Sequence, residues 1–169
     1  MPTSEGTVFR RPHWCIMADM RYLLNCTIAM VWALWLGGLI TLFLSVTALF
    51  STNYDLARQA APVLFRRFEL YQLILAGSAV ALGLVWHLTG RSSARLVIVL
   101  VFILTAVGST VSHETITPRL DALEQAGQGR SDEFASLHGQ SMLIYLTDAV
   151  ALAAAGIALP AAMKGDRSK

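Results

Sequence analysis

The stretch that decides the fold is LLNCTIAMVWALWLGGLITLFLSVTALF, Leu23–Phe50, in which no side chain is charged. An α-helix rises about 1.5 Å per residue, so about 20 apolar residues cross a hydrocarbon core about 30 Å thick. The stretch also exceeds the apolar part of a cleavable signal peptide, which is typically about 7–15 residues long. It is therefore predicted to be a helix that stays in a membrane.

Three further stretches have the same character: Phe68–Leu88, Leu96–Val111 and Met142–Met163. Hydrophobic residues make up 55% of the 169 residues and charged ones 14%, and the charges lie almost entirely between the stretches. A soluble helix would instead show a charged face to water along its whole length. We therefore expect an all-α integral membrane protein, a four-helix bundle with up-down topology that contacts the lipid bilayer.

Arginine and lysine side chains predict the orientation, because they are more frequent in short cytoplasmic loops. With the N-terminus in the cytoplasm, eight of these side chains lie inside and five outside. The five are Arg58, Arg66, Arg67, Arg119 and Arg130. We expect a multi-pass protein of the cell (inner) membrane, with cytoplasmic tails at 1–22 and 164–169 and an outer connection at 112–140.

Capping and turn residues predict how the helices begin and end. Asn53 is expected to cap or turn the chain before Leu56–Phe65, which reads as a short interfacial helix. Pro62 is expected either to start the second span or to kink it. Thr117-Pro118-Arg119 is expected to end the third helix or turn the chain, and Ser131 to cap the final helix.

Small residues recur at helical spacing on two of the predicted spans. The second span carries the pairs Gly77 with Ala81 and Ala79 with Gly83, and the fourth carries Ala154, Ala158 and Ala162. Such seams mark where membrane helices pack closely, either within the bundle or against other membrane subunits. The net charge of +2 is spread over the loops, so no basic stripe for nucleic acid is present.

Polar residues gather on one face of the last helix. His138, Ser141, Tyr145 and Asp148 are spaced by three, four and three residues, which places them within about 80° of one another. A carboxylate inside a membrane should face the bundle interior with a partner, so we expect Asp148 to be buried and bonded near Tyr145, Ser109 or His113. The complete candidate polar pocket is His113, Glu114, His138, Ser141, Tyr145, Asp148, Ser109 and Arg119.

Two interpretations of these residues stay open. One is a hydrogen-bonded seam between helices, and the other is an outward-open pocket for an ion, a metal, haem or a small molecule. For a metal, His113, Glu114 and His138 could converge and Met142 could add a soft ligand for copper, so the candidate ligands are His113, His138 and Met142. No strong metal or cofactor motif is present, and haem or copper are the alternatives.

No nucleophile elbow, phosphate loop or paired-carboxylate arrangement is present, so an enzyme is the less favoured class. The leading prediction is a small polytopic membrane protein without an evident catalytic motif, of unknown role or an accessory subunit of a larger membrane complex. The alternative is a transport or metal- or haem-handling module that uses the polar pocket in the outer half.

Four short motifs resemble a known family by their order and spacing. They are Trp35-Leu36-Gly37-Gly38, Ala61-Pro62-Val63-Leu64-Phe65, Thr117-Pro118-Arg119, and Phe134 with Leu137-His138-Gly139-Gln140-Ser141. Together they are similar to the transmembrane protein 205-like family, which includes bacterial proteins grouped under domain of unknown function 4149. The resemblance covers the chain from about Ala33 to Leu159.

The resemblance implies a four-helical membrane protein whose biochemical role is not established, with one branch associated with tolerance of metal-containing drugs. The characteristic positions that it implies are Trp35, Gly37, Pro118, Arg119 and His138. The family pattern would place asparagine one to two turns after His138, where this chain has Tyr145 and Asp148.

Overall fold

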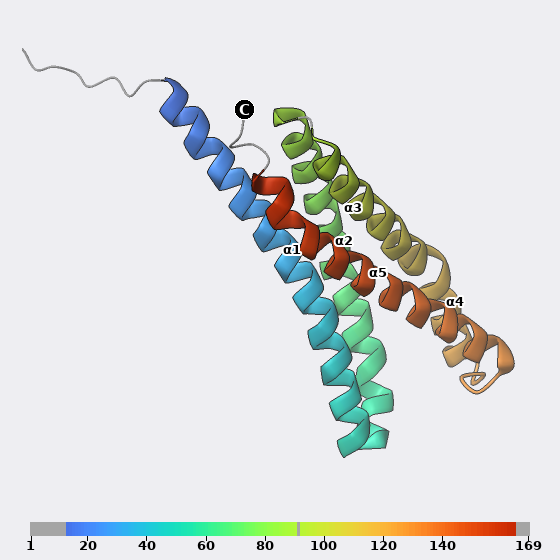
Figure 1. Ribbon diagram of the computed structural model, residues 1–169. Helices are drawn as coiled ribbons and strands as arrows, with labels where there is room; N and C mark the ends of the chain where they lie inside the picture. Colours follow the sequence, from blue (N-terminus) through green and yellow to red (C-terminus); the bar gives the residue numbers. More distant parts are fainter. Residues whose placement is uncertain (1–12, 91, 165–169) are drawn as a thin grey trace, which may run out of the picture.

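The computed structural model describes residues 13–90 and 92–164, with side chains from residue 20 onward. Its elements are α1 (His13–Thr52), α2 (Tyr54–Thr89), α3 (Ser93–Val111), the π-helical segment η1 (Ser112–Ile116), α4 (Thr117–Gln125) and α5 (Asp132–Lys164). Because α3, η1 and α4 follow one another without a break, the described chain forms four long helical rods and no strand (Figure 1).

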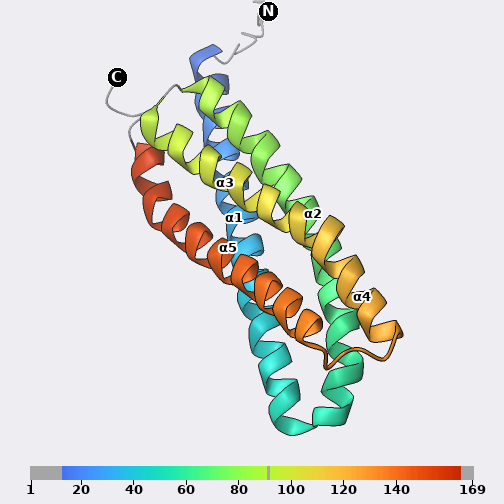
Figure 2. The ribbon, with the colours of Figure 1, turned by 90° about the vertical axis from the view of Figure 1, so that its right-hand side faces the viewer.

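The rods form a closed ring in which α1 packs on α2, α2 on α3, α3 on α5, and α5 back on α1. Successive rods run in opposite directions, so His13 and Lys164 lie toward the same end of the bundle, termed here the termini end (Figures 1 and 2). The opposite end, termed the loop end, carries the α1–α2 turn at Asn53 and the α4–α5 connection. At the loop end, the hairpin of α1 and α2 and the hairpin of α4 and α5 diverge from each other in Figures 1 and 2.

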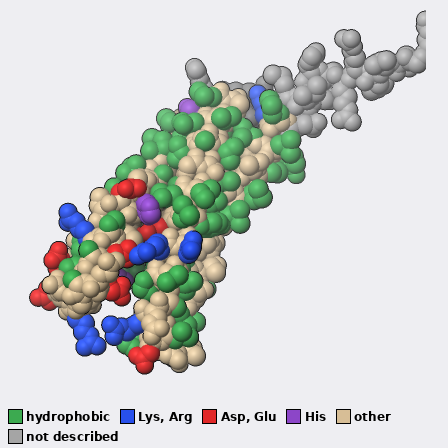
Figure 3. Space-filling view, turned by 180° about the vertical axis from the view of Figure 1, so that it is seen from behind, with side chains coloured by type: hydrophobic (Ala, Val, Ile, Leu, Met, Phe, Trp, Pro, Cys, Tyr) green, Lys and Arg blue, Asp and Glu red, His purple; other side chains and the backbone are tan. Residues whose placement is uncertain are grey.

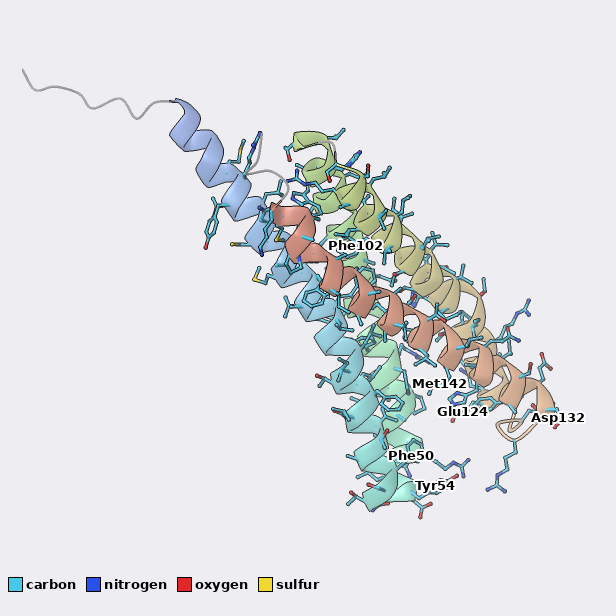
Figure 4. The ribbon with its side chains drawn as sticks, in the orientation of Figure 1. Phe50, Tyr54, Phe102, Glu124, Asp132 and Met142 are labelled. Atoms are coloured by element: carbon cyan, nitrogen blue, oxygen red, sulfur yellow. The ribbon has the colours of Figure 1, made fainter. Side chains whose placement is uncertain are left out.

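The core of the bundle is aromatic and aliphatic. Trp35, Phe102 and Leu152 are 0% exposed, and the rings of Trp35 and Phe102 are tilted with centroids 6.3 Å apart. Figure 4 places Phe102 in the half toward the termini end, away from Phe50 and Tyr54 at the α1–α2 turn and from Asp132 at the start of α5. Because the core is continuous around these side chains, it closes the bundle on the side of the termini.

The outer surface is also apolar, which a water-soluble bundle could not tolerate over so large an area. Ile157 is 84% exposed, and leucine side chains are exposed on each of the four long helices α1, α2, α3 and α5. Figure 3 shows most of the charged side chains on the visible face at the loop end and mainly hydrophobic side chains over the rest of that face. All four rods are long and apolar enough to cross a membrane, which indicates a multi-pass membrane protein.

Two expectations about helix ends were wrong. No separate interfacial helix covers Leu56–Phe65, since α2 runs unbroken from Tyr54 to Thr89 with Pro62 inside it. Proline removes one helical hydrogen bond, and here the carbonyl left without a donor belongs to Arg58, an exposed residue that water can reach. Asn53 caps this helix as predicted, because its Oδ1 accepts a hydrogen bond from the Leu56 amide at 3.0 Å.

The third helix does not end at Thr117-Pro118-Arg119. The π-helical turn η1 leads directly into α4, and Pro118 is the second residue of α4, immediately after the π-helical turn. A π-helical turn bonds residue i to i+5 and so fits one more residue into the helix than an α-turn does. With this wider turn, the helical rod continues through Pro118 without a break.

The final helix begins where the sequence predicts. The Ser131 Oγ accepts a hydrogen bond from the Phe134 amide at 3.1 Å, and Gly127 with φ 74° forms the break before it. Helix therefore occupies most of the predicted outer connection 112–140. Of the predicted tails, residues 1–12 and 165–169 lie outside the described residues, and α1 begins at His13, inside the predicted N-terminal tail.

The small-residue seams divide between the inside and the outside of the bundle. Ala79 and Gly83 are buried, and a Cβ on Gly83 would lie 3.2 Å from Val99 Cγ2, so this pair lets α3 approach α2. Gly77 and Ala81 are exposed. On α5, Ala162 is buried and Ala154 is exposed.

Candidate functional site: two layers of buried polar side chains

Three helical rods each place polar side chains one turn apart inside the bundle. The pairs are Glu69 and Gln72 on α2, Ser109 and His113 on the α3–η1 rod, and Tyr145 and Asp148 on α5. Spacings of three and four residues put each pair on one helix face. The pairs assemble into two layers: an outer layer of Glu69, His113, Thr117 and Tyr145, nearer the loop end, and an inner layer of Gln72, Ser109 and Asp148.

The outer layer is built around the carboxylate of Glu69, which is 5% exposed. Its Oε1 accepts hydrogen bonds from Thr117 Oγ1 at 2.5 Å and from Tyr145 Oη at 3.2 Å. Its Oε2 lies 3.2 Å from His113 Nδ1. Three groups therefore surround one buried carboxylate and give each of its oxygens a partner.

The inner layer is built around the carboxylate of Asp148, which is also 5% exposed. Ser109 Oγ lies 3.1 Å from Asp148 Oδ2, and Gln72 Nε2 lies 3.4 Å from the same oxygen and 2.5 Å from Ser109 Oγ. Asp148 is therefore turned into the bundle with a hydroxyl partner, the position that the helix-face pattern predicts.

Gly108 gives the Asp148 carboxylate its space. A Cβ at residue 108 would lie 3.2 Å from Asp148 Oδ1, which is tighter than an ordinary contact. The carboxylate therefore packs against the backbone of α3, next to the residue that hydrogen-bonds it. A glycine at this place is required by the close approach of α5 to α3.

The two layers differ in their access to the surface. The His113 side chain is 33% exposed and borders the loop end, whereas Asp148 is followed one turn deeper by Leu152 in the apolar core. Polar groups thus continue from the inner layer toward the loop end, whereas toward the termini end the large side chains next to the layer are apolar, and the buried Thr105 donates to the Val101 carbonyl of its own helix. The polar site therefore lies on the loop-end side of the apolar core.

The buried acids are not neutralised by a permanent positive charge. Arg66 of α2 forms an ion pair with Asp121 of α4, near the surface of the loop end. Among the described residues, no arginine or lysine forms an ion pair with Glu69 or Asp148. Within the described residues, His113 is the only basic side chain bonded to Glu69 or Asp148, and it is charged only when protonated.

Four of the predicted pocket residues come together in these layers: Ser109, His113, Tyr145 and Asp148. Ser141 is buried on the same face of α5, nearer the loop end. The other predicted residues, Glu114, Arg119 and His138, are exposed and lie outside the layers, and His138 stacks on Phe134 with ring centroids 6.1 Å apart.

The expected convergence of His113, Glu114 and His138 on one metal ion does not occur. Across residues 13–90 and 92–164, no three histidine, cysteine, aspartate or glutamate side chains gather as ligands of one ion would. Met142, the predicted soft ligand, is 38% exposed on α5. The physical reason is position along the helix: His138 precedes Tyr145 by seven residues, about 10 Å along α5, and it is exposed nearer the loop end, as is Met142.

Three members of the layers, Glu69, Gln72 and Thr117, were not in the predicted pocket. The signal in the sequence was a polar pair spaced by three residues, Glu69 and Gln72, inside an otherwise apolar stretch. Thr117 carried no such signal, because its position follows from the helix continuing through η1.

Together, the four membrane-length rods and the buried acids define a helical multi-pass membrane protein with ionisable groups inside its bundle. No family model, curated protein or solved structure matches the chain. Of the positions that the family resemblance singles out, Trp35 lies in the core, and Gly37 has no other side chain within 4 Å of a Cβ built on it.

Proposed function

We propose that the protein is a non-enzymatic, transport-type membrane module that admits a proton or a small cation from the loop end to its buried carboxylates. The observation that carries this proposal is the burial of Glu69 and Asp148, each 5% exposed, without a permanent counter-charge among the described residues. An acidic side chain near the middle of a membrane helix costs about 2.5–3.5 kcal/mol on insertion scales. The presence of two such residues in one small bundle favours a role in function over a role in helix packing alone.

The one-sided geometry supports entry from the loop end. His113 is partly exposed and touches Glu69, and the same face of α5 leads from Tyr145 to Asp148 one turn deeper. Beyond Asp148 the core closes around Leu152, Phe102 and Trp35. With the termini on the cytoplasmic side, as the arginine and lysine distribution predicts, the entrance faces the outside of the cell.

Ion movement across liposomes tests this proposal. The purified protein is reconstituted with a pH-sensitive or a sodium-sensitive dye inside the vesicles, and an inward gradient of the matching ion is applied. We expect a change of internal pH or of internal sodium concentration that depends on the protein and is lost in Asp148→Asn. The matched control is Glu114→Gln, which removes an exposed acid next to the same site.

Folding of each variant is checked by its elution as a single species in detergent. Wild-type vesicles that behave like empty ones under both gradients would refute the proposal. So would an Asp148→Asn variant that moves ions at the wild-type rate.

A second candidate, an accessory subunit of a larger membrane complex, is favoured by a different surface. An open groove of about 530 Å³ lies between α1 and α2, lined in part by Gly37, Gly38, Thr41 and Tyr71. Small residues on an outward helix face allow another helix to approach closely. Purification in mild detergent with mass spectrometry of bound subunits tests this role, and Gly37→Leu should release a subunit that docks there.

A further inference from the structure

The inner layer contains more hydrogen-bond acceptors than donors. Its donors are the Gln72 amide group and the single hydroxyl proton of Ser109. Two acceptors compete for that proton, because Ser109 Oγ lies 2.9 Å from the Thr105 carbonyl oxygen and 3.1 Å from Asp148 Oδ2. The acceptors include both oxygens of Asp148 and the amide oxygen of Gln72.

The amide oxygen of Gln72 shows the imbalance most clearly. Gln72 is 1% exposed, and its Oε1 has no hydrogen-bond partner among the described residues. Its Nε2, rather than this oxygen, faces Asp148 Oδ2 at 3.4 Å and Ser109 Oγ at 2.5 Å. Turning the amide over would bring Oε1 to the position of Nε2, where it would face Asp148 as acceptor against acceptor, and that arrangement is unfavourable unless a proton or a cation lies between the two oxygens.

The outer layer shows the opposite balance. Glu69 faces three possible donors, Thr117, Tyr145 and His113, and so already has partners for both of its oxygens. A buried acceptor without a donor is unfavourable unless a proton or a cation reaches it. The deficit therefore lies specifically at Asp148 and Gln72.

We infer that the inner layer binds one small, hard cation of the sodium type, in competition with a proton, through oxygens of Asp148, Gln72 and Ser109. Carboxylate, amide and hydroxyl oxygens are the ligands that hard cations prefer. With the Gln72 amide turned over, a protonated Asp148 could donate to Gln72 Oε1 and satisfy the same acceptor that the cation would use, so either occupant excludes the other. This inference rests on the proposed function, since it names the ion that the site would take.

Other titratable groups face the inner layer from each neighbouring element. They are Glu69 on α2, His113 on η1 and Tyr145 on α5. The buried residues of α1, which are Ile28, Val31, Trp35 and Leu39, do not titrate. A pH effect that disappears in Asp148→Asn but persists in Glu69→Gln is therefore assigned to the inner layer.

Thermal unfolding of the purified protein in detergent tests the inference. The midpoint is measured in sodium chloride and in choline chloride of equal ionic strength, between about pH 6 and pH 9. We expect sodium to raise the midpoint at high pH and to lose this effect as the pH falls, because protons displace it. Gln72→Met, which keeps the length of the side chain and removes the oxygen, should weaken sodium binding at least tenfold.

Each control separates one explanation. Asp148→Asn should remove the sodium effect, and Glu114→Gln, an exposed acid on η1, should retain it. If Asp148→Asn does not fold, Gln72→Met carries the test by itself. A sodium effect that survives in both Asp148→Asn and Gln72→Met would place the ion elsewhere and overturn the assignment.

The test also separates the inference from the proposed function. Equal midpoints in sodium and choline at every pH would overturn the sodium site, while proton movement in liposomes would still support the proposed function. Sodium binding in detergent without ion movement in liposomes would refute transport and leave the binding site in place.

Discussion

The indole ring of Trp32 lies directly against Gly156, and this contact joins the first and last helices of the bundle. The Trp32 Nε1 donates a hydrogen bond to the Leu152 carbonyl at 2.7 Å, one helical turn before the glycine. A Cβ at residue 156 would lie 2.0 Å from Trp32 Cζ2. Because the ring is rigid and held by its hydrogen bond, no small side-chain movement can relieve such a clash.

Gly156→Ala should therefore destabilise the protein. We expect a loss of about 1–3 kcal/mol in the free energy of unfolding, the usual cost of overpacking a helix contact. Gly77→Ala is the matched control, since it changes a glycine in a membrane-length helix where a new Cβ meets nothing within 4 Å. Unfolding midpoints in detergent measure both, and equal midpoints for the two variants would contradict the contact.

Tyr145→Phe should cost about 0.5–1.5 kcal/mol, the net value of a buried hydrogen bond. The change removes the hydroxyl that donates to Glu69 Oε1 and keeps the ring, whose centroid lies 5.9 Å from that of Phe65. Tyr71→Phe is the control, because its hydroxyl makes only a long bond of 3.4 Å to the Leu34 carbonyl. A larger loss at Tyr71 than at Tyr145 would argue against the outer layer.

Asp148→Asn should raise the unfolding midpoint in choline chloride at about pH 8. Once the Gln72 amide is turned over, the asparagine amide can donate to Gln72 Oε1, and the change also removes a buried charge. We expect the free energy of unfolding to rise by about 1–3 kcal/mol, which is the cost of one unsatisfied buried polar group. Asp148→Ala, which supplies no donor, should show no such gain.

The sequence could predict the class of fold and half of the site. Apolar length alone predicts four membrane helices, and the spacing on α5 predicts that Tyr145 and Asp148 share an inward face. It could not predict that Glu69 faces them, because the phase of α2 depends on whether Pro62 breaks the helix. It also could not predict the path of the chain past Pro118, since proline usually marks a boundary and the π-helical turn that accommodates it has no local sequence signal.

Single cysteines should report the orientation that the arginine and lysine distribution predicts. A cysteine at Gln128, in the α4–α5 connection, should react with an impermeant maleimide in intact cells, and one at Ser92 should react only after lysis. The background variant lacks both native cysteines, of which Cys26 is exposed on α1. The reverse labelling pattern would place the termini outside.

The depth of Asp148 gives the site an electrical consequence. Asp148 lies on α5, which runs from Asp132 to Lys164, and it is six residues into the predicted span Met142–Met163. A positive charge that moves from the loop end to this residue would cross roughly a third of the membrane field, worth about 0.7 kcal/mol for each 100 mV. If the termini are cytoplasmic, as the arginine and lysine distribution predicts, the site would fill more readily in a cell with a negative interior than in a depolarised one. Occupancy of the inner layer would then follow the membrane voltage as well as the ion concentration.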